Sequence, residues 1–90
     1  MQHFYRDVPR LGHVAVSRHA QARCKELGIT EEQFSRVLRE PLRDVPDGQQ
    51  VLWRERDGIR LVVQLHPTPN RGARLVSTVY RIEPTNRVGR

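Results

Sequence analysis

Apolar positions in the first half of the chain recur at helical spacing. From residue 18 to residue 27, small and apolar side chains fall at i, i+4 and i+7, namely Ala20, Cys24 and Leu27. Ser17 precedes this segment as a helix N-cap, and Gly28 follows it in the position where many helices end. The pattern predicts a short helix that buries this stripe of side chains.

A second helix is predicted directly after the first. Thr30 and Gln33 form a capping-box pattern, in which each side chain bonds to the backbone of the other residue. The apolar residues that follow have helical spacing: Phe34, Val37 and Leu38. Pro41 prevents the helix from continuing much further. The two helices, joined through Gly28 and Ile29, therefore form a predicted helical hairpin.

The second half of the chain changes to β-like patterns. Strands are predicted at about residues 49–55, 59–66 and 74–82. Asp57-Gly58 is a hairpin signal between the first two strands, and a turn is predicted before them at Pro46-Asp47-Gly48. The continuous apolar run Leu61-Val62-Val63 predicts burial on both faces of the sheet.

These elements predict an α+β fold, with a two-helix hairpin packed on a three- to four-stranded antiparallel sheet. Residues 1–90 are expected to form a single domain, with its core at about residues 14–83. Residues 1–13 are expected to be a flexible arm or a short edge strand, and residues 84–90 a flexible tail.

The chain is strongly basic. Its formal net charge is +6, and Lys25 is the only lysine among the 16 basic residues. Arginine pairs with phosphate oxygens through a planar fork, so RNA, DNA or an acidic protein is an expected partner. A GC-rich coding sequence explains an arginine excess equally well, and both interpretations stay open at this point.

Cysteine usage and the length of the apolar runs indicate a compartment. Cys24 stands alone, which excludes an internal disulfide and favours a reducing environment. The apolar runs are far shorter than the ~20 residues that span a bilayer, and the first residues lack the apolar stretch of a signal peptide. We therefore expect a cytoplasmic protein that does not associate with a membrane.

Candidate chemistry centres on the first helix, where His19 and Arg23 lie one turn apart. Metal-independent RNA cleavage needs groups that move protons and a cation that stabilises the charged phosphorane. An imidazole titrates near physiological pH, and a guanidinium binds phosphate through two bonds. Two structural interpretations stay open: His19 bridges helix and sheet by hydrogen bonds, and Arg23 pairs with Glu26 on a solvated face.

Four short motifs carry a resemblance to a known family: His19-Ala20-x-x-Arg23, Gly28-Ile29-Thr30, Asp57-Gly58 and Thr78-Val79-Tyr80-Arg81. Over about residues 14–83 the chain resembles the family called domain of unknown function 4258, which is similar to RelE-type and BrnT-type toxins and to barnase-like ribonucleases. The resemblance implies a RelE-like or barnase-like fold and metal-independent RNA cleavage. It also implies a phage, mobile-element or toxin–antitoxin context, with a cognate antitoxin as a partner.

By the same resemblance, the catalytic residues would be His19, Arg23, Thr78, Tyr80 and Arg81. The helix motif supplies the imidazole and one cation, and the final strand supplies hydroxyl groups and a second cation. The motifs contain no second histidine and no glutamate. A toxin ribonuclease and a descendant that has lost cleavage therefore both stay open.

Nucleic-acid or partner binding is expected at five further residues: Arg18, Trp53, Arg54, Arg71 and Arg74. The only tryptophan lies among charged residues, which suits base stacking between cations, but core packing explains its presence as well. The histidines and the cysteine are scattered along the chain, so we expect no metal site and no cofactor.

The sequence thus supports a small basic RNA-interacting protein that resembles toxin-type ribonucleases. The alternative is a non-enzymatic phage or mobile-element inhibitor that binds a host protein or a nucleoprotein complex. A DNA-binding regulator is disfavoured, because the second predicted helix opens with Glu31 and Glu32, where a recognition helix would meet phosphates.

Overall fold

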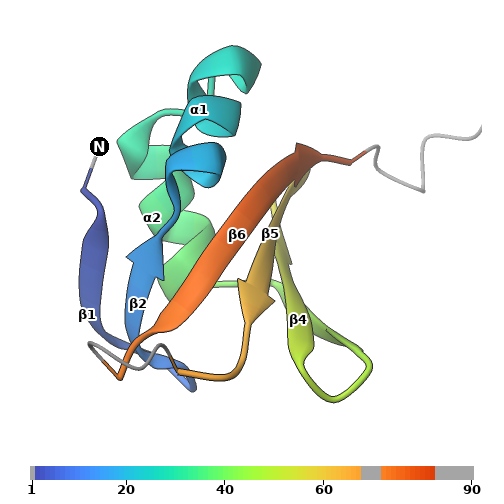
Figure 1. Cartoon of the computed structure of the whole chain (residues 1–90). Coiled ribbons are helices and arrows are strands. Elements are labelled where there is room, and N and C mark those ends of the chain that lie inside the picture. The colour runs from blue at the N-terminus through green and yellow to red at the C-terminus, as the bar shows by residue number, and fades with distance from the viewer. Residues whose placement is uncertain (1, 68–71, 83–90) are drawn as a thin grey trace, which may run out of the picture.

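A mixed β-sheet forms the framework of this protein. The computed structural model describes residues 2–67 and 72–82. Its strands are β1 (Phe4–Val8), β2 (Gly12–Val16), β3 (Arg43–Asp47), β4 (Val51–Arg56), β5 (Ile59–Gln64) and β6 (Arg74–Arg81). Two helices lie between β2 and β3 in the chain (Figure 1), namely α1 (Arg18–Leu27) and α2 (Glu31–Arg39).

The strand order shows that the predicted three- to four-stranded antiparallel sheet was wrong. The described residues form a six-stranded sheet in the order β1-β2-β6-β5-β4-β3. β2 pairs with β6 in parallel, whereas every other neighbouring pair of strands is antiparallel. The sheet is therefore mixed and larger than the sequence pattern indicated.

Two strands were not predicted, β2 and β3; β2 lies inside the sheet between β1 and β6, and β3 lies at an edge. β3 includes Pro46 and Asp47, which the sequence pattern assigned to a turn, and the turn instead covers residues 48–50. A proline has no N–H for a neighbouring strand, so it is tolerated in a strand that pairs on one side alone. The short and charged β3 fits this edge position.

The amino-terminal segment contributes to the core. Residues 1–13, expected as an arm or a short edge strand, include the edge strand β1 and the start of β2. Tyr5, Val8 and Leu11 are buried in the hydrophobic core, which therefore extends beyond residues 14–83. The expected tail at residues 84–90 lies outside the described residues.

The helix termini follow the predicted capping signals. The Ser17 side chain accepts a hydrogen bond from the backbone N–H of Ala20, and Gly28 has the left-handed conformation that ends α1. Thr30 and Gln33 form both bonds of the capping box at the start of α2. Neither helix is long and apolar enough to cross a membrane.

The helices pack on different parts of the sheet instead of chiefly on each other as a hairpin. α1 packs against β6, and α2 packs against β4 and β5. Figure 1 shows α2 behind the sheet and α1 above the end of β2, beside the upper half of β6. This arrangement follows from β2, which ends directly at the start of α1.

The predicted Asp57-Gly58 hairpin is confirmed. Both residues have positive φ, 53° at Asp57 and 75° at Gly58, as a type I′ turn requires. The turn joins β4 to β5 and sets their register, in which Arg56 lies opposite Ile59 and Glu55 opposite Arg60. This register decides which side chains share a face of the two strands.

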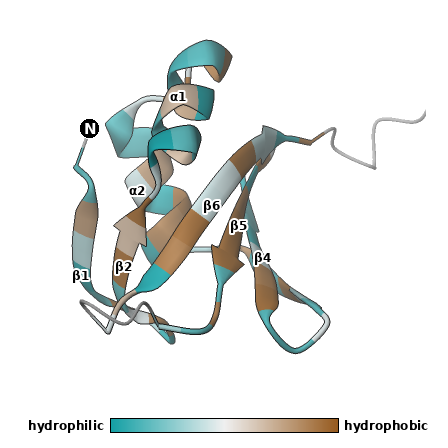
Figure 2. Cartoon of the chain, viewed as in Figure 1, coloured by the Kyte–Doolittle hydropathy of each residue, from teal (hydrophilic) through white to brown (hydrophobic). Residues whose placement is uncertain are grey.

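One face of the sheet meets the helices and is deeply buried. Its strand residues are Val14, Val16, Leu61, Val63, Val76 and Val79, and α2 contributes Phe34, Val37 and Leu38. Figure 2 shows this apolar character concentrated on the strands, with polar residues in the turns and on the outer surface of α1.

The opposite face, called the open face below, has no helix over it among the described residues. Strand alternation and register place half-buried side chains there: Phe4, Ala15, Val45, Val51, Trp53, Val62 and Leu75. Burial of the run Leu61-Val62-Val63 on both faces was a wrong expectation, since Val62 is half-buried on the open face. The same face also carries the half-buried polar side chains Arg60, Gln64 and Thr78, so the protein presents a sheet surface of mixed apolar and polar character.

We expect the fold to weaken in alkaline solution through Tyr5. Its hydroxyl donates to Oε2 of Glu31 at 3.0 Å, and burial followed by this hydrogen bond raises the pKa of Tyr5 far above its usual value of 10.0. The folded state thus favours the neutral phenol. The resulting stability is present below about pH 10 and is lost as the pH rises further.

The matched variant is Tyr5→Phe, which keeps the ring contact with Phe34. Thermal melts between pH 7 and pH 11 should show a smaller alkaline loss of Tm in the variant than in the parent chain. Equal alkaline losses of Tm in the two chains would contradict this assignment.

Candidate functional site

Four of the residues predicted as catalytic form two contacting pairs where α1 meets β6, namely His19 with Thr78 and Arg23 with Tyr80, whereas the fifth, Arg81, contacts the far end of α1. At this junction the Ser17 backbone N–H donates to the carbonyl oxygen of Val76 at 3.0 Å. The Ser17 hydroxyl also donates to the carbonyl oxygen of Ser77 at 3.0 Å. These bonds fix the first turn of α1 against the middle of β6, so side chains of the helix reach the carboxyl-terminal half of that strand.

His19 contacts Thr78, although the two residues are 59 positions apart in the chain. The imidazole Nε2 lies 3.1 Å from the Thr78 hydroxyl oxygen, and the tautomer decides which atom donates. A register shift makes this contact available: Val62 pairs with Thr78 but Val63 pairs with Val76, so β6 has one extra residue at this point. His19 thus bridges helix and sheet and keeps an exposed ring.

Arg23 lies one turn further along α1, between an acid and an aromatic ring. Its Nη1 donates to Oε1 of Glu26 at 3.0 Å, and its guanidinium carbon lies 6.0 Å from the centroid of the Tyr80 ring. Tyr80 is 46% exposed. An exposed i,i+3 ion pair contributes only a few tenths of a kcal/mol, so an incoming phosphate can replace Glu26.

Arg81 anchors the far end of α1 instead of pointing to the imidazole. Its Nε and Nη2 donate to the carbonyl oxygen of Leu27 at 3.3 and 3.0 Å. The last carbonyl groups of a helix lack partners within the helix, and a cation there also complements the helix dipole. Arg81 therefore positions α1 against β6 and with it the two candidate side chains, His19 and Arg23.

The junction is electropositive. On α1, Arg18 directly precedes His19 and is exposed, whereas Lys25 lies on another side of the helix, in a hollow with Ile29 and Glu31. Glu26 is the one acid of that helix. The site thus combines an imidazole, two hydroxyl groups and several cations, a set that can hold a phosphate and move a proton. Within the parts of the chain that the structure describes, no three metal-ligating side chains cluster, so no protein metal site is assigned.

Arg54, predicted to bind nucleic acid or a partner, is instead fully buried. Its Nε and Nη2 donate to the two carboxylate oxygens of Asp44, each at 2.8 Å. Its Nη1 donates to the carbonyl oxygens of Leu38 at 2.7 Å and Pro9 at 3.1 Å. Arg54 holds the fold together and lies away from the α1–β6 junction.

Arg74 has a similar structural position. Its Nε donates to the carbonyl oxygen of Leu65 at 2.9 Å, and its Nη1 to that of Leu11 at 2.7 Å. Arg71 lies outside the described residues. Of the five predicted binding residues, Arg18 and Trp53 are therefore the ones that the structure leaves at a surface where a ligand can reach them.

Several arginines donate hydrogen bonds to main-chain carbonyl groups. The sequence did not predict this structural role. The arginines with such bonds are Arg39, Arg54, Arg56, Arg74 and Arg81. No sequence motif marks these bonds, because the carbonyl groups belong to segments far away in the chain. These five of the 15 arginines therefore have a structural role, which accounts for part of the arginine excess.

A second missed feature lies on the open face, around Trp53. The guanidinium carbon of Arg60 lies 4.1 Å from the centroid of the indole ring. Arg60 Nε donates to Oε2 of Glu55 at 2.6 Å, and Arg43 Nε lies 3.3 Å from Oε1 of the same carboxylate. The Asp57-Gly58 turn could have predicted the contact between Glu55 and Arg60, because a two-residue turn places these two residues opposite each other.

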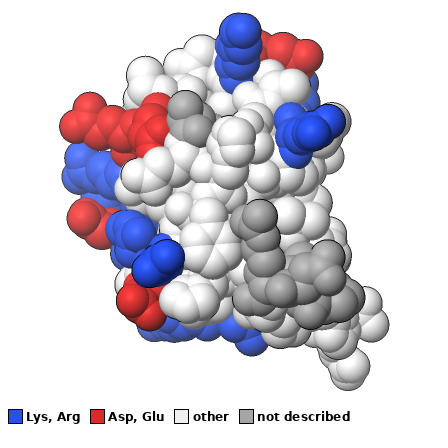
Figure 3. All heavy atoms as spheres, turned by 60° about the vertical axis from the view of Figure 1, so that its left-hand side comes forward, with Lys and Arg blue, Asp and Glu red and all other residues white. Residues whose placement is uncertain are grey.

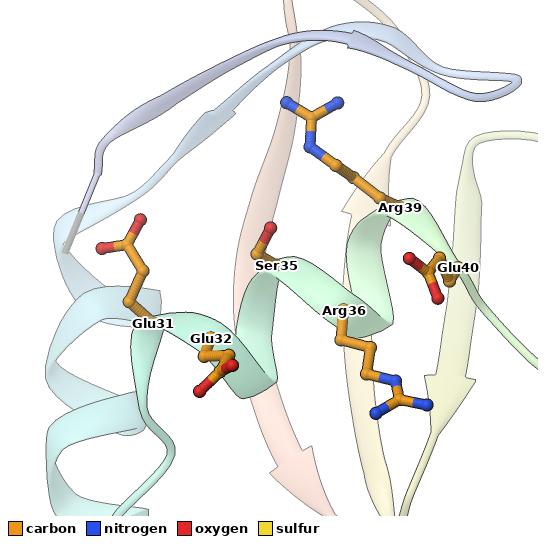
Figure 4. A pocket seen from close by; sticks show the side chains of 6 residues that line it. All are labelled: Glu31, Glu32, Ser35, Arg36, Arg39 and Glu40. Atoms are coloured by element: carbon orange, nitrogen blue, oxygen red, sulfur yellow. The ribbon is translucent and has the colours of Figure 1, made fainter.

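A hollow of about 680 Å³ lies along α2. Figure 4 shows its charged side chains diverging, with Arg39 directed toward β1 and Arg36 toward the opposite side. Arg39 donates to the carbonyl oxygen of Arg6, and Glu31, Glu32 and Glu40 lie beside the cations. Figure 3 likewise shows acidic and basic side chains intermixed along the left-hand side of the surface. Positive charge is therefore not concentrated at this hollow, because acidic side chains lie among its arginines.

The chain has no match among known proteins in the comparisons made with it. No family model matches it, and no curated protein and no solved structure shows significant similarity. The function proposed below is therefore inferred from the residues and from the geometry of the α1–β6 junction.

We expect Arg54→Met to lower the free energy of unfolding by about 3–5 kcal/mol, because the buried Asp44 carboxylate loses its ion-pair partner. Arg10→Gln is the matched control, since Arg10 is 79% exposed and lies 3.5 Å from the same carboxylate. Its expected loss is within about 0.5 kcal/mol. Urea denaturation measures both values, and similar losses in the two variants would refute the buried role of Arg54.

Proposed function

We propose that the protein binds RNA at the α1–β6 junction and belongs to the class of metal-independent, toxin-type ribonucleases or their binding-only descendants. The observation that carries the proposal is the convergence of His19, Arg23, Thr78 and Tyr80 on one accessible surface. The exposed cation Arg18 directly precedes His19 at the start of α1, and a cation there suits a polyanion. A cytoplasmic location is part of the proposal.

In the proposed chemistry, His19 moves a proton and Arg23 binds the phosphate. The hydroxyl of Thr78, 3.1 Å from Nε2, orients the imidazole ring. The ribose 2′-oxygen bonds to phosphorus and loses its proton to a base, the bond from phosphorus to the 5′-oxygen breaks, and an acid protonates that leaving oxygen. Arg23 stabilises the charge on the phosphorane in between. Cleavage also needs a second group that exchanges a proton, and the phenol of Tyr80 is the group of that kind beside Arg23.

Binding is tested with a fluorescently labelled single-stranded RNA at low salt. Arg23→Gln should weaken the affinity several-fold and reduce the slope of log K against log salt by about 0.7, the change expected for one lost phosphate contact. Arg36→Gln is the control, because it removes the same charge from an exposed position on α2. Equal effects of the two substitutions would show non-specific attraction and would contradict a site at α1.

Cleavage is tested separately, by incubating RNA with the protein in the presence of EDTA. Cleavage should persist without metal, His19→Ala should abolish it, and the affinity for RNA should change little. Thr78→Val should reduce the rate less than His19→Ala does, because it removes the orienting hydroxyl and keeps the imidazole. RNA that is bound but left intact by the parent chain assigns the protein to the binding-only descendants.

A second candidate function is the binding of an acidic protein surface, as a phage or mobile-element inhibitor or as a toxin that binds its antitoxin. The observation that favours it is Leu42, which is 70% exposed and lies beside Arg43 in two neighbouring hollows. An exposed leucine among arginines suits an acidic partner with an apolar side chain. Leu42→Asp should abolish such binding and leave the affinity for RNA unchanged.

A further inference from the structure

We propose that Trp53 and Arg60 form a base-stacking subsite on the open face, for the unpaired base next to the phosphate that is bound at the α1–β6 junction. This inference rests on the proposed RNA binding and adds a second contact region with a different ligand chemistry. Its ligand is the flat face of a purine or pyrimidine base.

The pair is held in place by ionic bonds on its own face of the sheet. Arg60 lies over the indole ring at 4.1 Å and donates to the Glu55 carboxylate at 2.6 Å. Arg43 approaches the other oxygen of Glu55, which leaves that acid only 7% exposed. With the guanidinium fixed by Glu55, stacking of a base on this pair costs little side-chain entropy.

The strand register connects this subsite to the α1–β6 junction. Thr78 lies opposite Val62, and Val62 lies opposite Trp53, so the three side chains form one row on the open face. Tyr80 lies opposite Arg60 in the neighbouring row. Strands lie about 4.8 Å apart, so the Trp53 position is roughly 10 Å from the Thr78 position. This distance is short enough for adjacent parts of one RNA strand to occupy both regions.

The charges on this face suit bases better than phosphates. From β3 to β6 its ionised side chains are Arg43, Asp47, Glu55 and Arg60, which is two of each sign. The remaining half-buried side chains on these strands are uncharged: Val45, Val51, Val62 and Leu75 are apolar, and Gln64 and Thr78 are neutral and polar. A phosphate gains little on this neutral surface, whereas a base can stack on an aromatic ring or a guanidinium plane. The phosphates are therefore expected at α1, and the bases on the sheet.

The open face has room for a short stretch of RNA. Six strands spaced about 4.8 Å apart, with about five or six residues each at 3.3 Å per residue, present a projected area of roughly 400–500 Å². This area accommodates a few nucleotides, and self-association through the same face is one outcome that the fluorescence test below distinguishes.

The subsite requires an unpaired base, because a base inside a duplex has both faces covered by its neighbours. A single-stranded RNA decamer of mixed sequence should therefore bind more tightly than the blunt duplex of the same sequence. A decamer with abasic nucleotides, which keeps the phosphates, should bind at α1 without reaching the full affinity of the intact strand.

Trp53 is the only tryptophan, so its fluorescence reports directly on the subsite. Titration with the single-stranded decamer should quench the Trp53 emission. The midpoint of this quenching should equal the midpoint of binding measured by the fluorescence anisotropy of labelled RNA. The abasic decamer should leave the emission nearly unchanged.

Trp53→Leu should weaken binding of the decamer roughly tenfold, whereas Trp53→Phe should stay within about threefold of the parent chain, because a stacking ring remains. The Trp53→Phe variant also controls for a loss of folding in Trp53→Leu.

Three outcomes overturn the subsite. Stacking at Trp53 is refuted if RNA binds the parent chain without quenching the Trp53 emission and binds the Trp53→Leu variant with the same affinity. That result leaves the proposed RNA binding intact. An absence of RNA binding in the parent chain refutes both proposals. A shift of the Trp53 emission with protein concentration alone, in the absence of RNA, assigns the open face to self-association.

Discussion

The buried ion pair between Arg54 and Asp44 is the constraint on which the rest of the structure depends. One guanidinium bonds to Asp44 in β3, to the end of α2 at Leu38 and to the β1–β2 turn at Pro9. Both edge strands are thereby tied to the layer formed by α2. A chain of 90 residues has a small core, and charge-assisted bonds to carbonyl groups supplement its hydrophobic stabilisation.

The arginines of this protein therefore fall into groups that differ in what their guanidinium groups contact. One group, represented by Arg54 and Arg74, donates to the main chain and serves the fold. A smaller group on α1, with Arg18 and Arg23, remains accessible beside an imidazole. The open face adds Trp53 with its own stacked cation. We infer a division of labour in which α1 binds phosphates and the sheet binds bases.

Local signals predicted α1, α2 and the Asp57-Gly58 hairpin, because caps and tight turns depend on neighbouring residues. The parallel pairing of β2 with β6 depends on residues about 60 positions apart, which no local pattern records. Pro46 also hid β3. At the site, the motif placed His19 near Thr78, but the burial of Arg54 depends on distant carbonyl groups and could not be predicted.

We propose that the accessible cations of α1 and the open face bind RNA, whereas the carbonyl-bound arginines do not. An NMR titration of the isotopically labelled chain with single-stranded RNA measures this directly through the arginine Nε–H and indole N–H signals. The account predicts changes at Arg23 and Trp53, with the Arg54 and Arg74 signals unmoved. Changes confined to the α2 surface around Arg36, with Arg23 and Trp53 unaffected, would contradict it.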